Sequence, residues 1–356
     1  MKISLTIALI ALSLIVKGQS NTWEGLTLQG YLEAYYAAPL HRTSDNNKPG
    51  FLYSHRRLYE PAVNLAFVSA SYKTDQVRAN IKWAAGTYMN DNYAAEPAGW
   101  KNIYEMNTGI RLSKQTGAAW WLDVGILPSH IGWESAVSKD CPTLTRSIAA
   151  ENSPYYETGA RLSYTSSNGK LYLAALVLNG WQTIHRTSTS PWPSLGTQVT
   201  WQASPALSLN SSTYLGVETP DGLQRIRYFH DGYAVYSPTQ ELHLTVGLDI
   251  GAQQRTPEPG KLSTWYSPVA ILQLAFNTRL AASFKGEYYS DADGVILSRG
   301  MSLWGLSTEL QYKMSDHALW RVEARHIRSD GALQNDHAGK EISANAFVTT
   351  SLAISF

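Results

Sequence analysis

Apolar and polar residues alternate along most of the chain, in segments of about ten residues that turn residues separate. In VRANIKWAAGTY, residues 77–88, the odd-numbered positions from Val77 to Ala85 are apolar, whereas Arg78, Asn80 and Lys82 lie between them. The segment ELHLTVGLDIGAQ repeats this pattern at 241–253. A period of two places one set of side chains on each face of a β-strand, whereas a helix would mix the two sets. The pattern therefore predicts an all-β protein.

Sixteen such segments follow one another. They lie at approximately 25–37, 60–73, 76–88, 103–113, 118–127, 155–166, 169–180, 194–204, 206–217, 228–237, 240–253, 264–276, 278–290, 302–313, 318–328 and 342–356. The segments 60–73, 169–180 and 228–237 alternate poorly, so counts of fourteen or eighteen strands stay open.

Short and long connections alternate between these segments. Short ones lie near 73–76, 166–169, 203–206, 237–240, 276–278 and 314–317, and long ones near 38–59, 89–102, 128–154, 181–193, 218–227, 254–263, 291–301 and 329–341. This is the plan of a transmembrane antiparallel β-barrel with short periplasmic turns and longer external loops. A large soluble β-sandwich is the alternative.

The aromatic composition favours the barrel over the sandwich. The chain has 21 Tyr and 12 Trp against 7 Phe. Tyr and Trp carry a polar group that a membrane–water interface can solvate while the ring stays in lipid. The formal net charge is +1 and no basic run is present, which argues against nucleic acid as a partner.

The two ends of the chain indicate export and membrane insertion. Lys2 precedes an apolar stretch from Ile3 to Val16, and Gly18 suits a cleavage site, so we expect residues 1–18 to be a removed signal peptide. An uncleaved anchor is the alternative. Residues 19–356 then form one barrel domain. The last segment alternates and closes on Phe356, which fits a final strand that pairs with 25–37 and carries the signal for the barrel-insertion machinery of the outer membrane.

Several stretches resemble a family of β-barrel porins that includes OmpL-like proteins of Gram-negative bacteria. They are DNYAAEPAGWKNIYEMNTGIRLSK, LDVGILPSHIGWESAVSKD, LTRSIAAENSPYYETGARLSY, LVLNGWQTI and RYFHDGYAVY. The resemblance runs from about residue 25 to the end of the chain. It implies a porin or channel in the cell outer membrane, without catalytic residues.

Strand charges are expected to face the water-filled lumen. The acidic ones are Glu33, Glu105, Asp123, Glu157, Asp249, Glu287, Glu309 and Glu323, and the basic ones are Arg78, Lys82, Arg111, Arg161, Arg279, Lys285, Arg321 and Arg325. A selective pore would show an excess of one sign, so these two sets of equal size predict weak ion selectivity. Alternatively, the charges are cross-strand pairs that only fill the wall.

A barrel of sixteen strands is wide enough to hold water, so we expect something to narrow it. The longest loop, 128–154, is the best candidate, because the corresponding loop folds inward in the general porins that this architecture resembles. Its charged residues would then form the constriction: Glu134, Lys139, Asp140, Arg146 and Glu151. A lid over the mouth is the alternative. Loop 38–59, with His55, Arg56 and Arg57, is a second candidate to fill the lumen.

The sequence favours a diffusion porin over an enzyme. It contains no HExxH, GxSxG, GxGxxG or Walker-type motif, and we expect neither a metal nor a cofactor. The predicted partners are outer-membrane lipids, the insertion machinery, small hydrophilic solutes and a second copy in a homo-oligomer. A substrate-specific channel, for example for sugars, and a plugged barrel that binds or adheres are the alternative functions.

Overall fold

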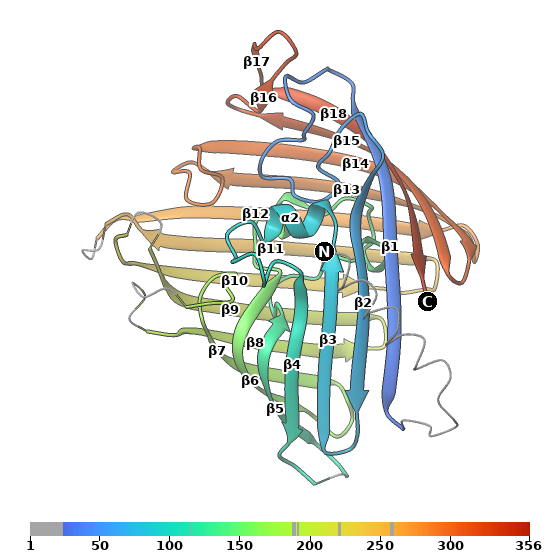
Figure 1. Ribbon diagram of the computed structural model, residues 1–356, viewed down its shortest axis with the longest axis vertical. Coiled ribbons are helices and arrows are strands. Elements are labelled where there is room, and N and C mark those ends of the chain that lie inside the picture. The colour runs from blue at the N-terminus through green and yellow to red at the C-terminus, as the bar shows by residue number, and fades with distance from the viewer. Residues whose placement is uncertain (1–23, 115, 187–189, 191, 220–221, 257–259) are drawn as a thin grey trace, which may run out of the picture.

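The computed structural model describes residues 24–114, 116–186, 190, 192–219, 222–256 and 260–356, in which sixteen antiparallel strands close into a barrel (Figure 1). The first eight are β1 (Leu26–Pro39), β2 (Ala62–Lys73), β3 (Val77–Ala85), β4 (Ile103–Arg111), β5 (Ala119–Pro128), β6 (Tyr156–Thr165), β7 (Leu171–Leu178) and β8 (Ser194–Ser204). The others are β9 (Leu207–Glu218), β10 (Arg225–Tyr236), β11 (Leu242–Gln254), β12 (Leu262–Ala275), β13 (Leu280–Asp291), β14 (Met301–Ser315), β15 (Ala318–Ser329) and β18 (Ala344–Ser355).

The sixteen-strand prediction is confirmed, and each predicted segment differs from its strand by at most three residues at either end. The predicted loop 329–341 contains a further small hairpin, β16 (Gln334–Asn335) with β17 (Glu341–Ile342). The described helices are α2 (Thr87–Asn92), α3 (Ile148–Glu151) and the 3-10 turn η1 (Ser138–Asp140), and none of them is long and apolar enough to cross a membrane. The predicted signal peptide, 1–18, lies outside the described residues.

The barrel closes between the first and the last strand. β1 pairs with β18 from Tyr31 opposite Ser355 to Pro39 opposite Phe347. Beyond that register, Gly30 donates to the Phe356 carbonyl at 2.8 Å and accepts from the Phe356 amide at 3.0 Å. The Phe356 ring lies against Gly30, where a Cβ atom would meet it at 2.3 Å. The final residue therefore completes the seam on the outer side of the wall.

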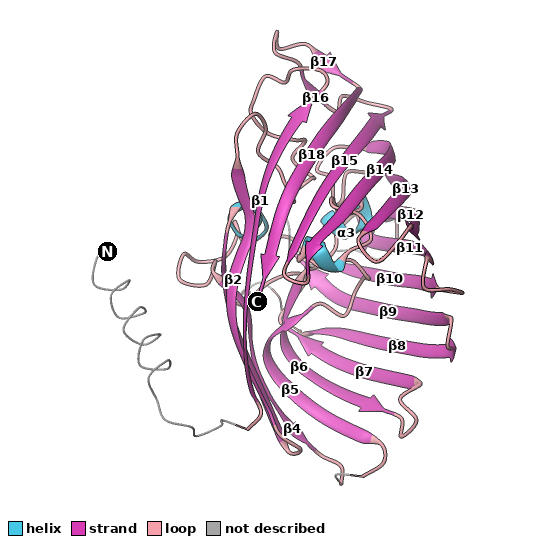
Figure 2. Cartoon of the chain, turned by 90° about the vertical axis from the view of Figure 1, so that its right-hand side faces the viewer, coloured by secondary structure: helices cyan, strands magenta, loops and turns pink. Residues whose placement is uncertain are grey.

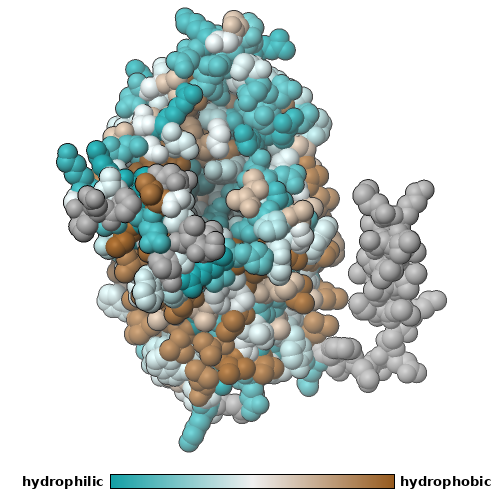
Figure 3. Space-filling model, turned by 60° about the vertical axis from the view of Figure 1, so that its left-hand side comes forward, coloured by the Kyte–Doolittle hydropathy of each residue, from teal (hydrophilic) through white to brown (hydrophobic). Residues whose placement is uncertain are grey.

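Alternation gives the wall an apolar outer face and a polar inner face. On β18, Val348, Leu352 and Ile354 are exposed outward, whereas Thr349 and Ser351 are buried inward. Hydrophobic side chains gather over the strands and hydrophilic ones over the loops (Figure 3). Outward aromatic rings collect near both strand ends, as in a membrane-spanning barrel. Tyr266, Tyr288 and Trp304 form such a contact near the long loops, with ring centroids 5.7 and 4.4 Å apart.

In three pairs of adjacent aromatic residues, the two rings lie on opposite faces of the wall. In Tyr35–Tyr36, Trp120–Trp121 and Trp265–Tyr266, one ring is exposed outward and its neighbour is buried inside the barrel. Trp265 is 1% exposed, whereas Tyr266 is 44% exposed. The two rings part because successive side chains of a strand point to opposite faces. The inward members pack in the lumen instead of at the membrane surface.

We predict that a charge is tolerated on one face of β8 and not on the other. Val199→Arg places a guanidinium on the lipid face midway along the strand and should lower the free energy of unfolding by about 2–4 kcal/mol. Gln198→Arg, at the neighbouring inward position, should cost much less. Equilibrium unfolding in phospholipid vesicles measures both, and equal losses would contradict the assigned faces.

Candidate pore constriction

The loop between β5 and β6, residues 129–155, lies inside the barrel. Its 3-10 turn and its short helix α3 sit within the ring of strands (Figure 2). Its backbone is bonded to inward side chains on the opposite wall. Leu144 donates to Glu309 at 2.8 Å, Thr145 to Glu323 at 2.5 Å and Ile148 to Glu287 at 2.6 Å. The loop therefore crosses the lumen and docks on β13, β14 and β15.

Wall cations hold the carbonyl groups of the same loop segment. Arg321 donates to the carbonyls of Ser138 and Cys141 at 2.5 and 3.1 Å. Lys285 donates to the Thr145 carbonyl at 2.5 Å. Arg325 donates to the Arg146 carbonyl at 2.9 Å. The loop has little regular structure of its own, so these side chains satisfy backbone groups that would otherwise be buried without partners.

The docking side chains also pair with one another. Arg321 lies 2.6 Å from Glu309, Arg325 2.5 Å from Glu287, and Lys285 3.8 Å from Glu323, and the exposed fractions of these six side chains are 5% or less. A buried ion pair is stable only when its remaining donors and acceptors find partners, and here the loop backbone supplies them. Gly305 leaves the space that Glu287 occupies.

The five residues predicted to form the constriction separate into two groups. Glu134, Arg146 and Glu151 are buried and hold the loops together: Glu134 accepts from the Ser147 amide at 3.1 Å, Arg146 lies 3.7 Å over the Tyr155 ring, and Glu151 accepts from the Tyr53 amide at 2.9 Å. Burial raises the pKa of Glu134, despite Lys285 and Arg146 nearby. Lys139 and Asp140 are 3.0 Å apart, with 35% and 53% of their side chains exposed, and only these two face water.

Two loop residues that the sequence analysis did not select position the start of the loop. His130 Nδ1 lies 2.8 Å from Glu157, and its Nε2 lies 2.8 Å from the Thr213 carbonyl. Burial acts to lower the pKa of His130, but Glu157 and this carbonyl outweigh it, so the pKa is raised. Trp133 lies over Gly247, where a Cβ atom would approach its ring to 2.1 Å. Neither contact leaves a signal in the local sequence, because both partners are distant along the chain.

The first long loop also enters the lumen. His55, which is buried, lies 3.1 Å from Glu33, and Arg56 lies 3.1 Å from Asp91 of α2. Arg57 is more exposed and bonds Glu60 at 2.8 Å. Lys48 reaches Thr349 on β18 at 3.0 Å, and burial lowers its pKa to about 7.

The other predicted lumen charges lie mainly on β3 to β6, the part of the wall that the loop between β5 and β6 leaves uncovered. Arg78 and Arg161 both contact Asp123, with nitrogen–oxygen distances of 2.5 and 3.3 Å. Lys82 lies 3.6 Å from Glu105. Two other positions complete the set: Arg111 at the end of β4, hydrogen-bonded to Ser113, and Asp249, which stands opposite Asp231 in the pairing of β10 with β11.

A closed barrel of sixteen antiparallel strands with a polar interior and an inward loop is the architecture of outer-membrane porins. The chain belongs to the family described as "Putative beta-barrel porin-2, OmpL-like", whose model matches residues 25–356. It is therefore an outer-membrane channel for passive diffusion, as the sequence analysis predicted, rather than a member of an enzyme family. The comparison with curated proteins found no match.

Solved porin structures share this fold. The outer-membrane channel DcaP of Acinetobacter baumannii aligns with a TM-score of 0.62 at 9% identity, covering 93% of this chain and 97% of that one. The anion-selective porin from Comamonas acidovorans gives 0.59 at 11%, covering 93% and 99%. The trimer form of OmpT from Vibrio cholerae gives 0.58 at 9%, with the same coverage. Identities this low establish the fold alone.

Within the described ranges, no group of three or more His, Cys, Asp or Glu could hold a metal ion.

Cys141 reports whether the loop is docked. It is 5% exposed, and burial, followed by the charge of Glu134, raises the pKa of its thiol to about 12. We predict slow maleimide labelling of the folded protein, with a rate that rises with pH beyond 9. Joint replacement of Arg321 and Glu309 by Gln removes one docking ion pair without leaving a buried charge, and should speed labelling at pH 7.5 by about tenfold or more.

Lys313→Gln serves as the control for this labelling experiment, because Lys313 lies at the exposed end of β14, where its ammonium is 2.7 Å from Asp316. Equally slow labelling of the Arg321/Glu309 variant would show that this pair does not hold the loop.

Proposed function

We propose that loop 128–154 sets the width of the diffusion pathway, so that small hydrophilic solutes pass between the loop and the β3–β6 wall. The observation that carries this proposal is the docking of the loop backbone on the ion pairs of β13–β15, across the barrel from where the loop originates. The docked side is dry. On the other side, the exposed fractions of the Arg78 and Lys82 side chains are 25% and 20%, which suits a water-filled path.

The first long loop narrows the same path nearer the external mouth. Phe51 and Leu52 join an apolar cluster with Ile148 of α3 and with the inward wall residues Phe229 and Trp265. Apolar contacts of this kind exclude water from part of the cross-section. Two loops thus share the restriction, which favours passage of small solutes and disfavours long chains.

The ends of the chain are assigned to export and insertion. The Phe356 ring is 76% exposed on the outer side of the seam, where the insertion machinery could contact it before the strand pairs. We assign residues 1–18 to a signal peptide that is removed on export. A homo-oligomer like the trimer form of OmpT is consistent with the apolar outer wall.

Single-channel conductance in a planar bilayer tests the role of the loop. Replacing residues 134–151 by a short Gly/Ser linker should raise the conductance by about twofold or more, because a lumen of sixteen strands is then open on the docking side as well. The control replaces residues 255–261, the external loop between β11 and β12, by a Gly/Ser linker of the same kind.

Heat-modifiable migration on a gel establishes that each variant is folded. Unchanged conductance of a folded linker variant would exclude the loop as the constriction. A folded natural protein that gives no channels at all would reject the open pore and favour a plugged barrel that binds or adheres.

A further inference from the structure

The inward charges of this barrel differ sharply in their access to water. The pairs on β13–β15 lie beneath the docked loop, and the most exposed of these side chains, Arg325, is 5% exposed. Glu33 and Glu157 are also fully buried, against His55 and His130. Most inward carboxylates are therefore covered. A count of acidic and basic residues that ignores this burial overstates the negative charge that a solute meets.

The uncovered wall, β3 to β6, carries more cations than carboxylates. Its basic side chains are Arg78, Lys82, Arg111 and Arg161, and its acidic ones are Glu105, Asp123 and Glu157, the last of which is buried against His130. A single carboxylate, Asp123, serves both Arg78 and Arg161, and it is 1% exposed while each guanidinium is 20% exposed or more. Arg111 bonds a serine hydroxyl. Water in the lumen therefore meets mainly positive groups on this wall.

Aromatic rings lie directly beside these cations. Tyr31, Phe67 and Tyr104 form a stacked row across β1, β2 and β4, with successive centroids 5.4 and 6.3 Å apart. The Lys82 ammonium lies 4.8 Å from the Phe67 centroid and 5.0 Å from that of Tyr104. Arg78 lies 4.3 Å over Trp121. A solute that passes this wall meets ring surfaces and positive charge together.

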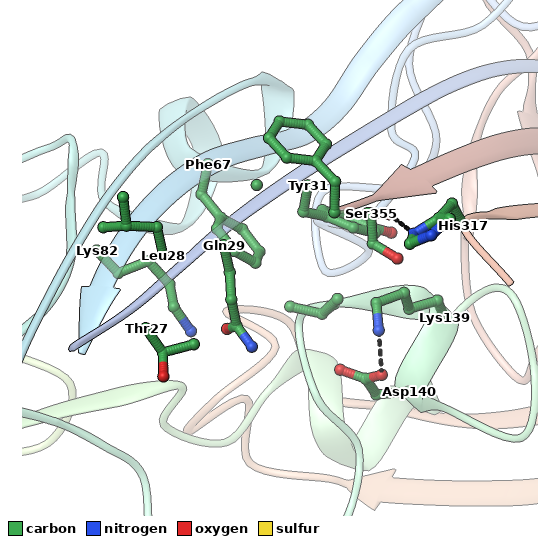
Figure 4. Close-up of a pocket in the computed structure, with 13 residues that line it drawn as sticks. Thr27, Leu28, Gln29, Tyr31, Phe67, Lys82, Lys139, Asp140, His317 and Ser355 are labelled. Carbon is green, nitrogen blue, oxygen red and sulfur yellow. Dashed lines mark hydrogen bonds and ion pairs between the residues drawn. The ribbon is translucent and has the colours of Figure 1, made fainter. Parts of the chain in front are cut away.

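A cavity of about 450 Å³ opens at this place, at the end of the barrel with the short turns (Figure 4). Tyr31, Phe67 and Lys82 line it from the strands, and Lys139 and Asp140 line it from the loop. Its size is that of sites for small organic molecules. The loop thus contributes an exposed ion pair, Lys139 with Asp140, to the same space.

We propose that this wall is a selectivity site for small organic anions that carry a planar apolar group. The proposal rests on the open pore proposed above and deepens it. A carboxylate or phosphate would contact Lys82, Arg78 or Lys139, while the flat part of the solute would lie on the half-buried rings of Phe67 and Tyr104. Tyr31 is 2% exposed and stacks on Phe67. The excess of cations over exposed carboxylates on this wall would also favour simple anions over cations. The weak selectivity expected from equal charge counts is replaced here by a preference for anions.

Two measurements on the same bilayer, the reversal potential and the block by added anions, distinguish the effect of the cations from that of the aromatic rings. Under a KCl gradient, the reversal potential should show chloride to be about fivefold more permeable than potassium. Lys82→Gln combined with Arg111→Gln should bring that ratio close to one, and Lys313→Gln should leave it unchanged. Added benzoate should reduce the KCl current at about tenfold lower concentration than acetate. Benzyl alcohol, which has the ring without the charge, should have little effect.

Phe67→Leu should weaken the benzoate block and leave the reversal potential unchanged, because it removes a ring and no charge. A cation-selective or unselective natural protein would overturn the proposal. So would a benzoate block no stronger than that of acetate, or one that Phe67→Leu does not alter.

A silent bilayer would count against the open pore, and ligand-observed NMR then decides the site independently. Benzoate should bind the folded protein in neutral detergent and lose that binding in Lys82→Gln combined with Phe67→Leu. Absence of binding by the natural protein would refute the site as well.

Discussion

Pairing of every backbone amide and carbonyl in the wall is the constraint on which this structure depends. Lipid offers no partner for these groups, so a sheet that crosses a bilayer has to close on itself. Here closure depends on the seam between β1 and β18, which ends in the reciprocal bonds of Gly30 and Phe356. Once sixteen strands close, the lumen has a fixed width that wall side chains alone cannot fill. The long loops therefore occupy the rest of the lumen.

An irregular loop inside a barrel faces the same constraint as the wall. Its amides and carbonyls leave water, and it has few regular hydrogen bonds of its own. The ion pairs of β13–β15 supply partners for these groups. The paired side chains still have free donors and acceptors after they have bonded each other, and these bond the loop backbone. Arg321 bonds Glu309 and two loop carbonyls, while Glu309 also accepts the Leu144 amide. The wall charges and the loop backbone therefore stabilise each other, and neither arrangement is favourable alone.

The sequence predicts the strands and their faces well, because the period of two is local and repeats sixteen times. It also identifies the charges that point inward, since an odd or even position along a strand decides the face. It cannot predict which charges the loop covers. That depends on contacts such as Trp133 over Gly247 and His130 with Glu157, between residues on different elements. The same alternation decides which ring of an adjacent aromatic pair faces inward, as for Tyr35, Trp121 and Trp265, each of which is buried inside.

In this barrel, the position of the loop determines which charges the lumen exposes to solutes. Glu287, Glu309 and Glu323 are the carboxylates that hold the loop amides, and by holding them they are withdrawn from the water path. A loop that left the β13–β15 wall would uncover them, together with their paired cations, and would change both the width and the electrostatic character of the lumen. Composition alone gives a nearly neutral interior. The docked loop makes it asymmetric, with a dry wall of paired charges facing a wet wall in which cations predominate.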